Sequence, residues 1–230
     1  MSLRKSLLTA SIVCSCVATP VFADVYSAGQ SVEDDKGFYG VLSVGIGDID
    51  GTKWESTIGG TKYGGKAPVD AGFSGEVGIG YDFGAWRTDL TYENGGGDLG
   101  DCTETKVTGT NCSSTSGEVE TNSFMINAYY DIDTNSKWEP YVGAGIGTTN
   151  FDVENFTVGG TKYKLGDDDS TTYQLKAGVT HPVSDKMDLF GEAAYKIYDD
   201  IETSTNVAGV KFKVKDSTEW VAKLGLRYMF

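Results

Sequence analysis

The sequence predicts an all-β protein, an eight-stranded antiparallel up-and-down transmembrane β-barrel preceded by a cleaved signal peptide. Three observations lead there: an apolar run near the N-terminus that is too short to cross a bilayer, repeated segments in which apolar and polar residues alternate, and a last strand that ends on an aromatic residue. In a barrel wall one face of each strand meets lipid and the other meets the lumen. Alternation over about ten residues is therefore the expected pattern.

The N-terminus has the features of a secretory signal. Arg4 and Lys5 precede an apolar run over residues 7–17, and a small residue, Ala23, stands at the expected cleavage point. Such a run is shorter than the roughly 20 residues that a membrane helix needs. We expect residues 1–23 to be removed. An alternative, acylation of Cys16 as in a lipoprotein, has a poor lipobox in Val13-Cys14-Ser15.

The remaining chain divides into a short periplasmic segment, residues 24–36, and a barrel domain, residues 37–230. Period-two alternation gives four strands in the first half of the barrel, whose outward-facing positions are Phe38, Leu42, Val44 and Ile46; Phe73, Val77, Ile79, Tyr81 and Phe83; Trp86, Thr88, Leu90 and Tyr92; Phe124, Ile126, Ala128 and Tyr130. Four more follow, with Val142, Ala144 and Ile146; Tyr173, Leu175, Ala177 and Val179; Leu189, Ala193, Tyr195 and Ile197; and the even-numbered residues from Trp220 to Phe230. Charge is kept off this face of every strand, which a soluble β-sandwich would not require.

The connections alternate in length, and this predicts the orientation. Short connections occupy residues 84–85, 131–138 and 182–186, whereas long, polar and glycine-rich ones occupy roughly 48–70, 94–120, 150–170 and 199–216. Short turns are periplasmic and long loops extracellular in outer-membrane barrels. Both mature termini are then periplasmic.

Charge and composition exclude several classes of protein. Loss of Arg4 and Lys5 with the signal leaves 17 basic against 33 acidic side chains, so the net charge changes from −14 to −16. A chain this acidic lacks the basic surface that binds nucleic acid. After Ala23 no apolar stretch approaches the length of a membrane helix.

Two cysteines, Cys102 and Cys112, remain after the signal, in a stretch rich in Gly, Ser and Thr. In an exported protein an isolated pair at this separation predicts a disulfide that closes a loop, worth on the order of 3 kcal/mol. A metal site is disfavoured because no histidine is nearby.

A short motif recurs at an offset of one hundred residues. Residues 57–63, Thr-Ile-Gly-Gly-Thr-Lys-Tyr, return as 157–163, Thr-Val-Gly-Gly-Thr-Lys-Tyr. One hypothesis is a barrel of two four-strand halves. The other is that Gly-Gly between β-branched arms is simply a favoured hairpin tip.

The inward positions are polar and of mixed sign. The predicted lumen charges are Glu76, Arg87, Asp89, Lys176, Glu192, Lys196, Lys223 and Arg227. Side chains fill the interior of an eight-stranded barrel, and buried charges must pair. We therefore expect an ion-pair network that plugs the lumen. The alternative is a water-filled pore, which five bases against three acids would make anion-preferring.

The sequence offers no catalytic, cofactor or metal site. Its only histidine, His181, precedes Pro182 at a predicted periplasmic turn, away from the outer rim where barrel hydrolases place theirs. The run from Asp48 to Gly51 resembles the start of a calcium loop, but Gly59 stands at the position where such a loop needs a bidentate Glu.

The C-terminal residues Lys223, Gly225, Tyr228 and Phe230 resemble the terminal sorting signal of outer-membrane barrels. That resemblance implies recognition by the barrel-assembly machinery. Further motifs are Gly37–Gly45, Asn127–Ile132, Pro140–Gly147 and Gln174–Val179. Together they resemble the opacity/surface-antigen family of small outer-membrane barrels, relatives of the OmpA membrane domain. This resemblance implies a surface antigen, adhesin or envelope component.

The sequence thus predicts a non-enzymatic surface protein of the bacterial outer membrane, with long acidic extracellular loops and a salt-bridged, largely closed lumen. We expect a monomer, embedded in outer-membrane lipid, that contacts an unknown extracellular ligand and no nucleic acid. The alternative is a narrow porin-like channel for small solutes or ions.

Overall fold

The computed structural model describes residues 36–50, 53–58, 61–66, 69–100, 104–105, 116–158, 161–163, 168–204, 211–215 and 217–230. The predicted signal peptide and residues 24–35 lie outside this part. Every regular element in the described residues is a strand. None of these residues belongs to a helix long and apolar enough to cross a membrane.

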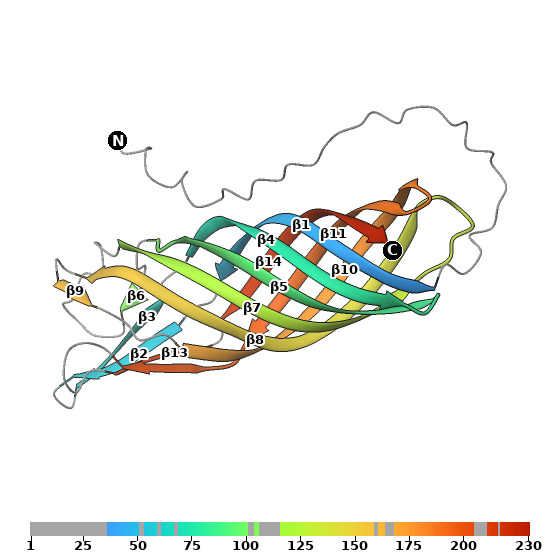
Figure 1. Cartoon of the computed structure of the whole chain (residues 1–230). Helices are drawn as coiled ribbons and strands as arrows, with labels where there is room; N and C mark the ends of the chain where they lie inside the picture. Colours follow the sequence, from blue (N-terminus) through green and yellow to red (C-terminus); the bar gives the residue numbers. More distant parts are fainter. Residues whose placement is uncertain are drawn as a thin grey trace, which may run out of the picture. The chain divides into compact units, whose positions relative to one another are not determined.

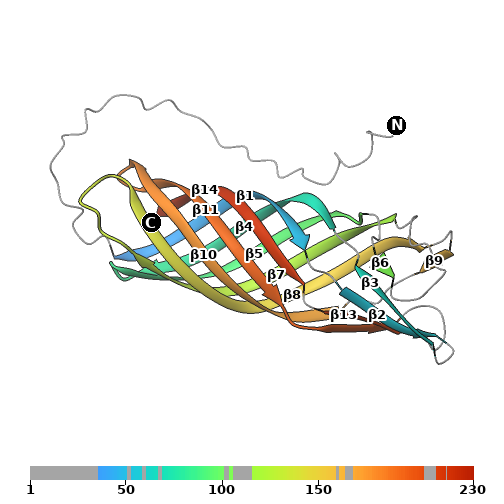
Figure 2. The ribbon, with the colours of Figure 1, turned by 180° about the vertical axis from the view of Figure 1, so that it is seen from behind.

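Eight long strands form a closed antiparallel barrel (Figure 1), which confirms the predicted fold. They are β1 (Gly37–Asp50), β4 (Val69–Asp82), β5 (Trp86–Asp98), β7 (Ser116–Asp131), β8 (Glu139–Val158), β10 (Asp168–Ser184), β11 (Met187–Tyr198) and β14 (Thr218–Met229). Each pairs with the next along the chain, and β14 pairs with β1 to close the wall. The view from behind (Figure 2) shows β14 between β11 and β1.

Burial alternates along the wall as the sequence predicts. On β14 the even-numbered residues from Trp220 to Tyr228 are exposed and the odd-numbered ones from Glu219 to Arg227 are buried. Phe73, on the outer side of β4, is 81% exposed, whereas Tyr39, on the inner side of β1, is 0% exposed. The outer surface is therefore apolar.

A second sheet of five strands lies where we expected long loops. Its order is β12 (Ile201–Ser204), β13 (Lys211–Lys215), β2 (Lys53–Ile58), β3 (Thr61–Lys66) and β6 (Glu104–Thr105). A further strand, β9 (Thr161–Tyr163), pairs with the end of β8.

The barrel strands have 12 to 20 residues rather than the expected ten or so. Beyond the lipid band the outward residues of the wall are polar, such as Glu118 and Glu120, although the backbone pairing continues. A prediction from apolar outward faces therefore stops short of the strand ends.

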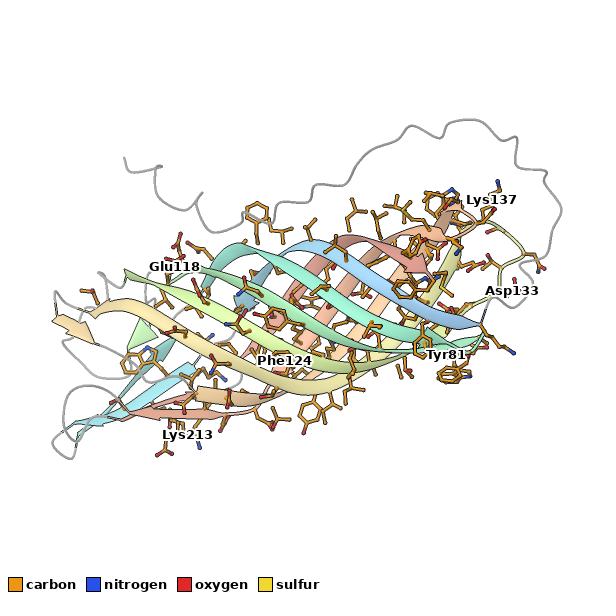
Figure 3. The ribbon with its side chains drawn as sticks, in the orientation of Figure 1. Tyr81, Glu118, Phe124, Asp133, Lys137 and Lys213 are labelled. Carbon is orange, nitrogen blue, oxygen red and sulfur yellow. The ribbon has the colours of Figure 1, made fainter. Side chains whose placement is uncertain are left out.

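The two ends of the barrel differ. The short-turn end carries Phe83–Ala85, residues 132–138 and Asp185–Lys186, and the long-loop end carries the other four connections. Figure 3 labels Tyr81, Asp133 and Lys137 at the short-turn end and Glu118 and Lys213 toward the other. Gly84 has φ of 102°, a left-handed conformation that glycine adopts without strain.

The offset-100 motif has the same register in both copies. In the wall Ile46 pairs with Phe73 and Ile146 with Tyr173; at the tips Thr57 pairs with Lys62 and Thr157 with Lys162. This agreement supports the two-halves hypothesis for the β1–β4 and β8–β10 hairpins. The copies differ beyond them: Asp82 pairs with Arg87, but Pro182 pairs with Asp188, a shift of one residue.

Candidate functional site

The candidate site is the lumen, which holds a continuous chain of oppositely charged side chains. This charge chain consists of Glu192, Lys176, Glu76, Lys223, Glu93, Lys196 and Glu219, in the order of contact. Lys223 lies at its centre, with its Nζ 2.8 Å from carboxylate oxygens of both Glu76 and Glu93. Six of the seven side chains are no more than 3% exposed, so each charge depends on its neighbours for solvation.

Two contacts of the charge chain span the lumen. Strands β4 and β10 are four positions apart in the closed order, as are β5 and β11, so each pair lies on opposite sides of the barrel. Nζ of Lys176 on β10 is 3.5 Å from Glu76 on β4, and Nζ of Lys196 on β11 is 3.0 Å from Glu93 on β5. Direct contact between opposite walls leaves no open path at this level.

Two arginine pairs lie nearer the short-turn end. Arg87 binds Asp131 through two hydrogen bonds, from Nε at 2.6 Å and from Nη2 at 2.8 Å. Its guanidinium also lies 4.8 Å from the ring centroid of Tyr129, at a distance typical of a cation–π contact. Arg227 contacts Asp188, with Nη2 at 2.8 Å from Oδ2.

Asp89 lies outside the charge chain and is hydrogen-bonded to uncharged side chains. Its carboxylate accepts hydrogen bonds from the Tyr39 hydroxyl at 3.1 Å and from the Asn127 amide at 2.7 Å. Asn127 in turn accepts a hydrogen bond from Gln174 at 2.5 Å. A cavity of about 20 Å³, with Arg87 in its lining, borders this network and has room for about one water.

Inward-facing aromatic rings pack over glycines of the next strand. These pairs are Tyr39 with Gly80, Tyr129 with Gly143, Tyr141 with Gly178, and Phe190 with Gly225. A Cβ atom at Gly178 would lie 2.4 Å from Cζ of Tyr141, and one at Gly225 would lie 2.3 Å from Cζ of Phe190. The glycines therefore make space for rings that fill the interior.

An apolar cluster lies inside the barrel at the long-loop end. Ile49, Val69 and Val119 are buried there, with Leu99, Phe151 and Val153 packed against them. Hydroxyl groups from neighbouring strands form a buried ladder below it: Thr149 is 2.8 Å from Ser123 and 2.7 Å from Thr172. The lumen thus changes from apolar at the mouth to charged at its centre.

All eight predicted lumen charges are buried inside the barrel, but the prediction was incomplete. It missed Glu93 and Glu219, with which the buried charges of the described residues number five acids and five bases. The expected excess of bases is therefore wrong. It also missed Asp131 and Asp188, the partners of the two arginines. Glu93 follows the outward-facing Tyr92, and Glu219 precedes the outward-facing Trp220. Continuing the alternation by one residue in each strand would therefore have placed both glutamates on the inward face.

The other predicted residues fall in several places. Lys223 belongs to the charge chain, Gly225 lies beneath Phe190, and Tyr228 and Phe230 face outward. Cys102 and Cys112 lie outside the described residues, so their disulfide stays a prediction.

His181 lies at the short-turn end, where its ring stacks on Trp138 at a centroid distance of 4.4 Å and its Nδ1 is 3.2 Å from the Lys137 carbonyl oxygen. Across the described part of the chain, no three His, Cys, Asp or Glu side chains are grouped so as to hold a metal ion.

A family model for the outer membrane protein beta-barrel domain matches residues 9–213. The chain belongs to this family. Its members are bacterial outer-membrane barrels, in agreement with the apolar outer surface. No curated protein matches the chain.

Solved structures with the same fold include three outer-membrane proteins. OprG from Pseudomonas aeruginosa has a TM-score of 0.58 and 20% identity, over 85% of this chain and 97% of that one. Neisserial surface protein A has a TM-score of 0.51 and 20% identity, over 84% of this chain and 97% of that one. A major outer membrane protein from Thermus thermophilus has a TM-score of 0.51 and 14% identity, over 83% of this chain and 99% of that one. At these identities the likeness concerns the fold alone.

Proposed function

We propose that this protein is a non-enzymatic surface protein of the outer membrane whose barrel is a closed anchor and whose strand extensions at the long-loop end contact an extracellular ligand. In this proposal the long-loop end faces outward and both mature termini are periplasmic. Surface antigen, adhesin and envelope component are the roles compatible with it.

The main support for this proposal is the closed lumen. Glu93 and Lys196 touch across the full width of the barrel, and so do Glu76 and Lys176. An unpaired charge in this interior costs several kcal/mol, which opposes any rearrangement that separates the walls. The apolar cluster around Val119 adds a second barrier at the mouth.

The contact surface is assigned to the long-loop end because that end holds most of the polar chain outside the barrel. The expectation of uniformly acidic loops needs refinement. Acidic side chains such as Glu118 and Glu120 continue the wall there, but β2, β3 and β13 are rich in lysine.

Lys223, Gly225, Tyr228 and Phe230 also support delivery by the barrel-assembly machinery. The aromatic side chains are exposed on the outer face, where another protein can bind them during assembly. Lys223 and Gly225 face inward and stabilise the finished barrel.

Single-channel recording of the refolded mature protein in a planar bilayer tests the proposal. We expect a silent bilayer from the wild type. A Glu93→Ala/Lys196→Ala double variant removes one contact across the lumen and should pass small currents. A matched control, Glu55→Ala/Lys215→Ala, removes an exposed pair at 2.9 Å and should stay silent.

Steady openings of the wild type, with an ion selectivity that changes on Arg87→Gln substitution, would overturn the closed-lumen proposal. The protein would then be a narrow porin-like channel.

A further inference from the structure

We propose that a row of amide side chains on the outer face of the wall binds the uncharged sugar headgroup of a glycolipid in the surrounding leaflet. This amide row consists of Asn94 on β5, Asn122 on β7 and Asn150 on β8, with Asp169 on β10 at its end. The inference rests on the outward orientation of the long-loop end proposed above and adds a class of ligand to it.

Backbone register places these side chains next to one another. Asn94 pairs with Asn122, Asn122 pairs with Asn150, and Asn150 pairs with Asp169. Each is an even number of residues from a lipid-facing residue of its own strand, such as Phe124 on β7. Side chains alternate between the faces of a strand, so the whole row lies on the outer face.

Hydrogen bonds hold the row in place and leave one position open. The Tyr92 hydroxyl at 2.7 Å and the Asn94 amide nitrogen at 3.0 Å both donate to the Asn122 amide oxygen. The Asn150 amide nitrogen donates to Asp169 at 3.2 Å. Within the described residues, no hydrogen bond uses the Asn122 amide nitrogen or the Asn150 amide oxygen. A donor and an acceptor on directly paired residues match a hydroxyl group, which both accepts and donates.

The row lies at the level of lipid headgroups. Directly beneath it, next to the apolar band, Tyr92 pairs with Phe124, and their ring centroids are 4.8 Å apart. Aromatic side chains gather at the boundary between hydrocarbon and water. Asn94 and Asn122 are each two residues further toward the long-loop end. That separation is about 7 Å of extended chain, or about 5 Å of height at the usual strand tilt.

The charges around the row favour an uncharged ligand over a phosphate. Strands β5, β7, β8 and β10 contain two lysine or arginine residues, Arg87 and Lys176, and both are buried in the lumen. On the other side of the row from the lipid, Glu120 pairs with Asp152. Glu118 lies further still toward the long-loop end, as Figure 3 shows. These carboxylates repel a phosphate and leave sugar hydroxyl groups unaffected.

The rings below the row add an apolar contact that a sugar can use. Phe124 is 61% exposed, and Tyr92 beside it is also exposed. The C–H face of a sugar ring packs on an aromatic side chain, while its hydroxyl groups bond to amides. A soluble sugar could make the same contacts, but it has no acyl chains to hold it at this depth. The position next to the apolar band therefore favours a lipid-linked sugar.

Lipid retention by the full mature protein tests the inference. The protein is reconstituted in phosphatidylcholine vesicles that contain equal amounts of digalactosyldiacylglycerol and phosphatidylglycerol, and retained lipids are counted by native mass spectrometry. Both leaflets contain both lipids, so the direction of insertion does not affect the count. We compare the wild type with Asn122→Ala/Asn150→Ala. The control, Thr88→Ala/Asn135→Gly, removes a hydroxyl group within the apolar band and an amide at the short-turn end, where glycine readily adopts the φ of 54°.

We expect the wild type to retain the galactolipid in preference to phosphatidylglycerol. The double variant should retain about tenfold less galactolipid, because the hydrogen bonds of two side chains are lost. The control should retain as much as the wild type. Equal retention of the two lipids by the wild type would overturn the inference, and so would unchanged retention by the double variant. Binding of soluble lactose to the wild type without retained galactolipid would also overturn it, since the row would then be a site for a free saccharide.

The double variant should fold, because both changes are on the outer face beyond the lipid band, and its tryptophan emission should match the wild type. The wild-type preference between the two lipids is a second readout that depends on no variant. A conducting wild type would refute the closed lumen without changing the lipid result, so the two proposals fail separately.

Discussion

The centre of the lumen and its two ends are packed by different kinds of contact. At the centre Glu76, Glu93 and Lys223 meet with nitrogen-to-oxygen distances of 2.8 Å. At the long-loop end Val119 belongs to an apolar cluster, and at the short-turn end rings such as Tyr141 pack over glycine. Charged contacts require one arrangement of strands, whereas apolar contacts tolerate small changes of shape. The centre should therefore be the most sensitive part of the barrel to substitution.

The largest effect is expected from Lys223→Gln. It leaves Glu76 and Glu93 facing each other without the cation between them, and breaking a buried pair in this way costs about 3–5 kcal/mol. The measurement is the free energy of unfolding in urea, in lipid vesicles, followed by tryptophan fluorescence. Adding Glu93→Gln should recover part of the loss. A cost below 1 kcal/mol for Lys223→Gln would contradict the central role of the charge chain.

A smaller effect is expected from Gly178→Ala. The new Cβ would lie 2.4 Å from the Tyr141 ring and 2.6 Å from the Gly191 carbonyl oxygen, so the wall must shift, at about 1–3 kcal/mol. Gly191→Ala is the control, since nothing lies within 4 Å of its Cβ position. The same unfolding experiment should separate the two variants; equal stabilities would show that the ring moves freely.

Val119→Ala should lower the free energy of unfolding by roughly 1–2 kcal/mol, because apolar burial is lost and a small cavity forms at the mouth. Because the charge chain is intact, the bilayer should stay silent. Currents from this variant would mean that the apolar cluster, and not the charge chain, is the main barrier.

The smallest effect is expected from His181→Ala. The side chain stacks on Trp138 at the surface and contacts no charge-chain residue, so unfolding should change by no more than about 0.5 kcal/mol. Lipid and peptide hydrolysis should be equally absent from the variant and the wild type. Wild-type hydrolysis that the substitution abolishes would refute the non-enzymatic assignment.

The sequence predicted those parts of the barrel in which lipid imposes a pattern. Where one face of a strand is bathed in hydrocarbon, as from Phe38 to Ile46 or from Trp220 to Phe230, each residue's side of the wall could be assigned. The lumen charges followed by elimination, because inward positions are the only ones that accept them.

The rest depends on contacts between distant strands. That Glu76 meets Lys176 across the lumen, or that Lys223 lies between two glutamates, follows from closure and stagger rather than from any local pattern. The second sheet was missed because segments such as Thr61–Lys66 mix lysine, threonine and glycine, as an irregular loop does. Pairing between β13 and β2 brings together segments more than 150 residues apart, which alternation along one segment cannot reveal.

The shared register of the β1–β4 and β8–β10 hairpins makes residues 76 and 176 equivalent positions, and their side chains touch 3.5 Å apart across the barrel. Two identical halves would place the same residue at both positions, giving two carboxylates or two ammonium groups in repulsion. With glutamate in one half and lysine in the other, each half complements only its opposite. The two halves thus carry opposite charges at the centre of the barrel. A barrel made from two copies of either half would have like charges facing each other there, which would oppose closure.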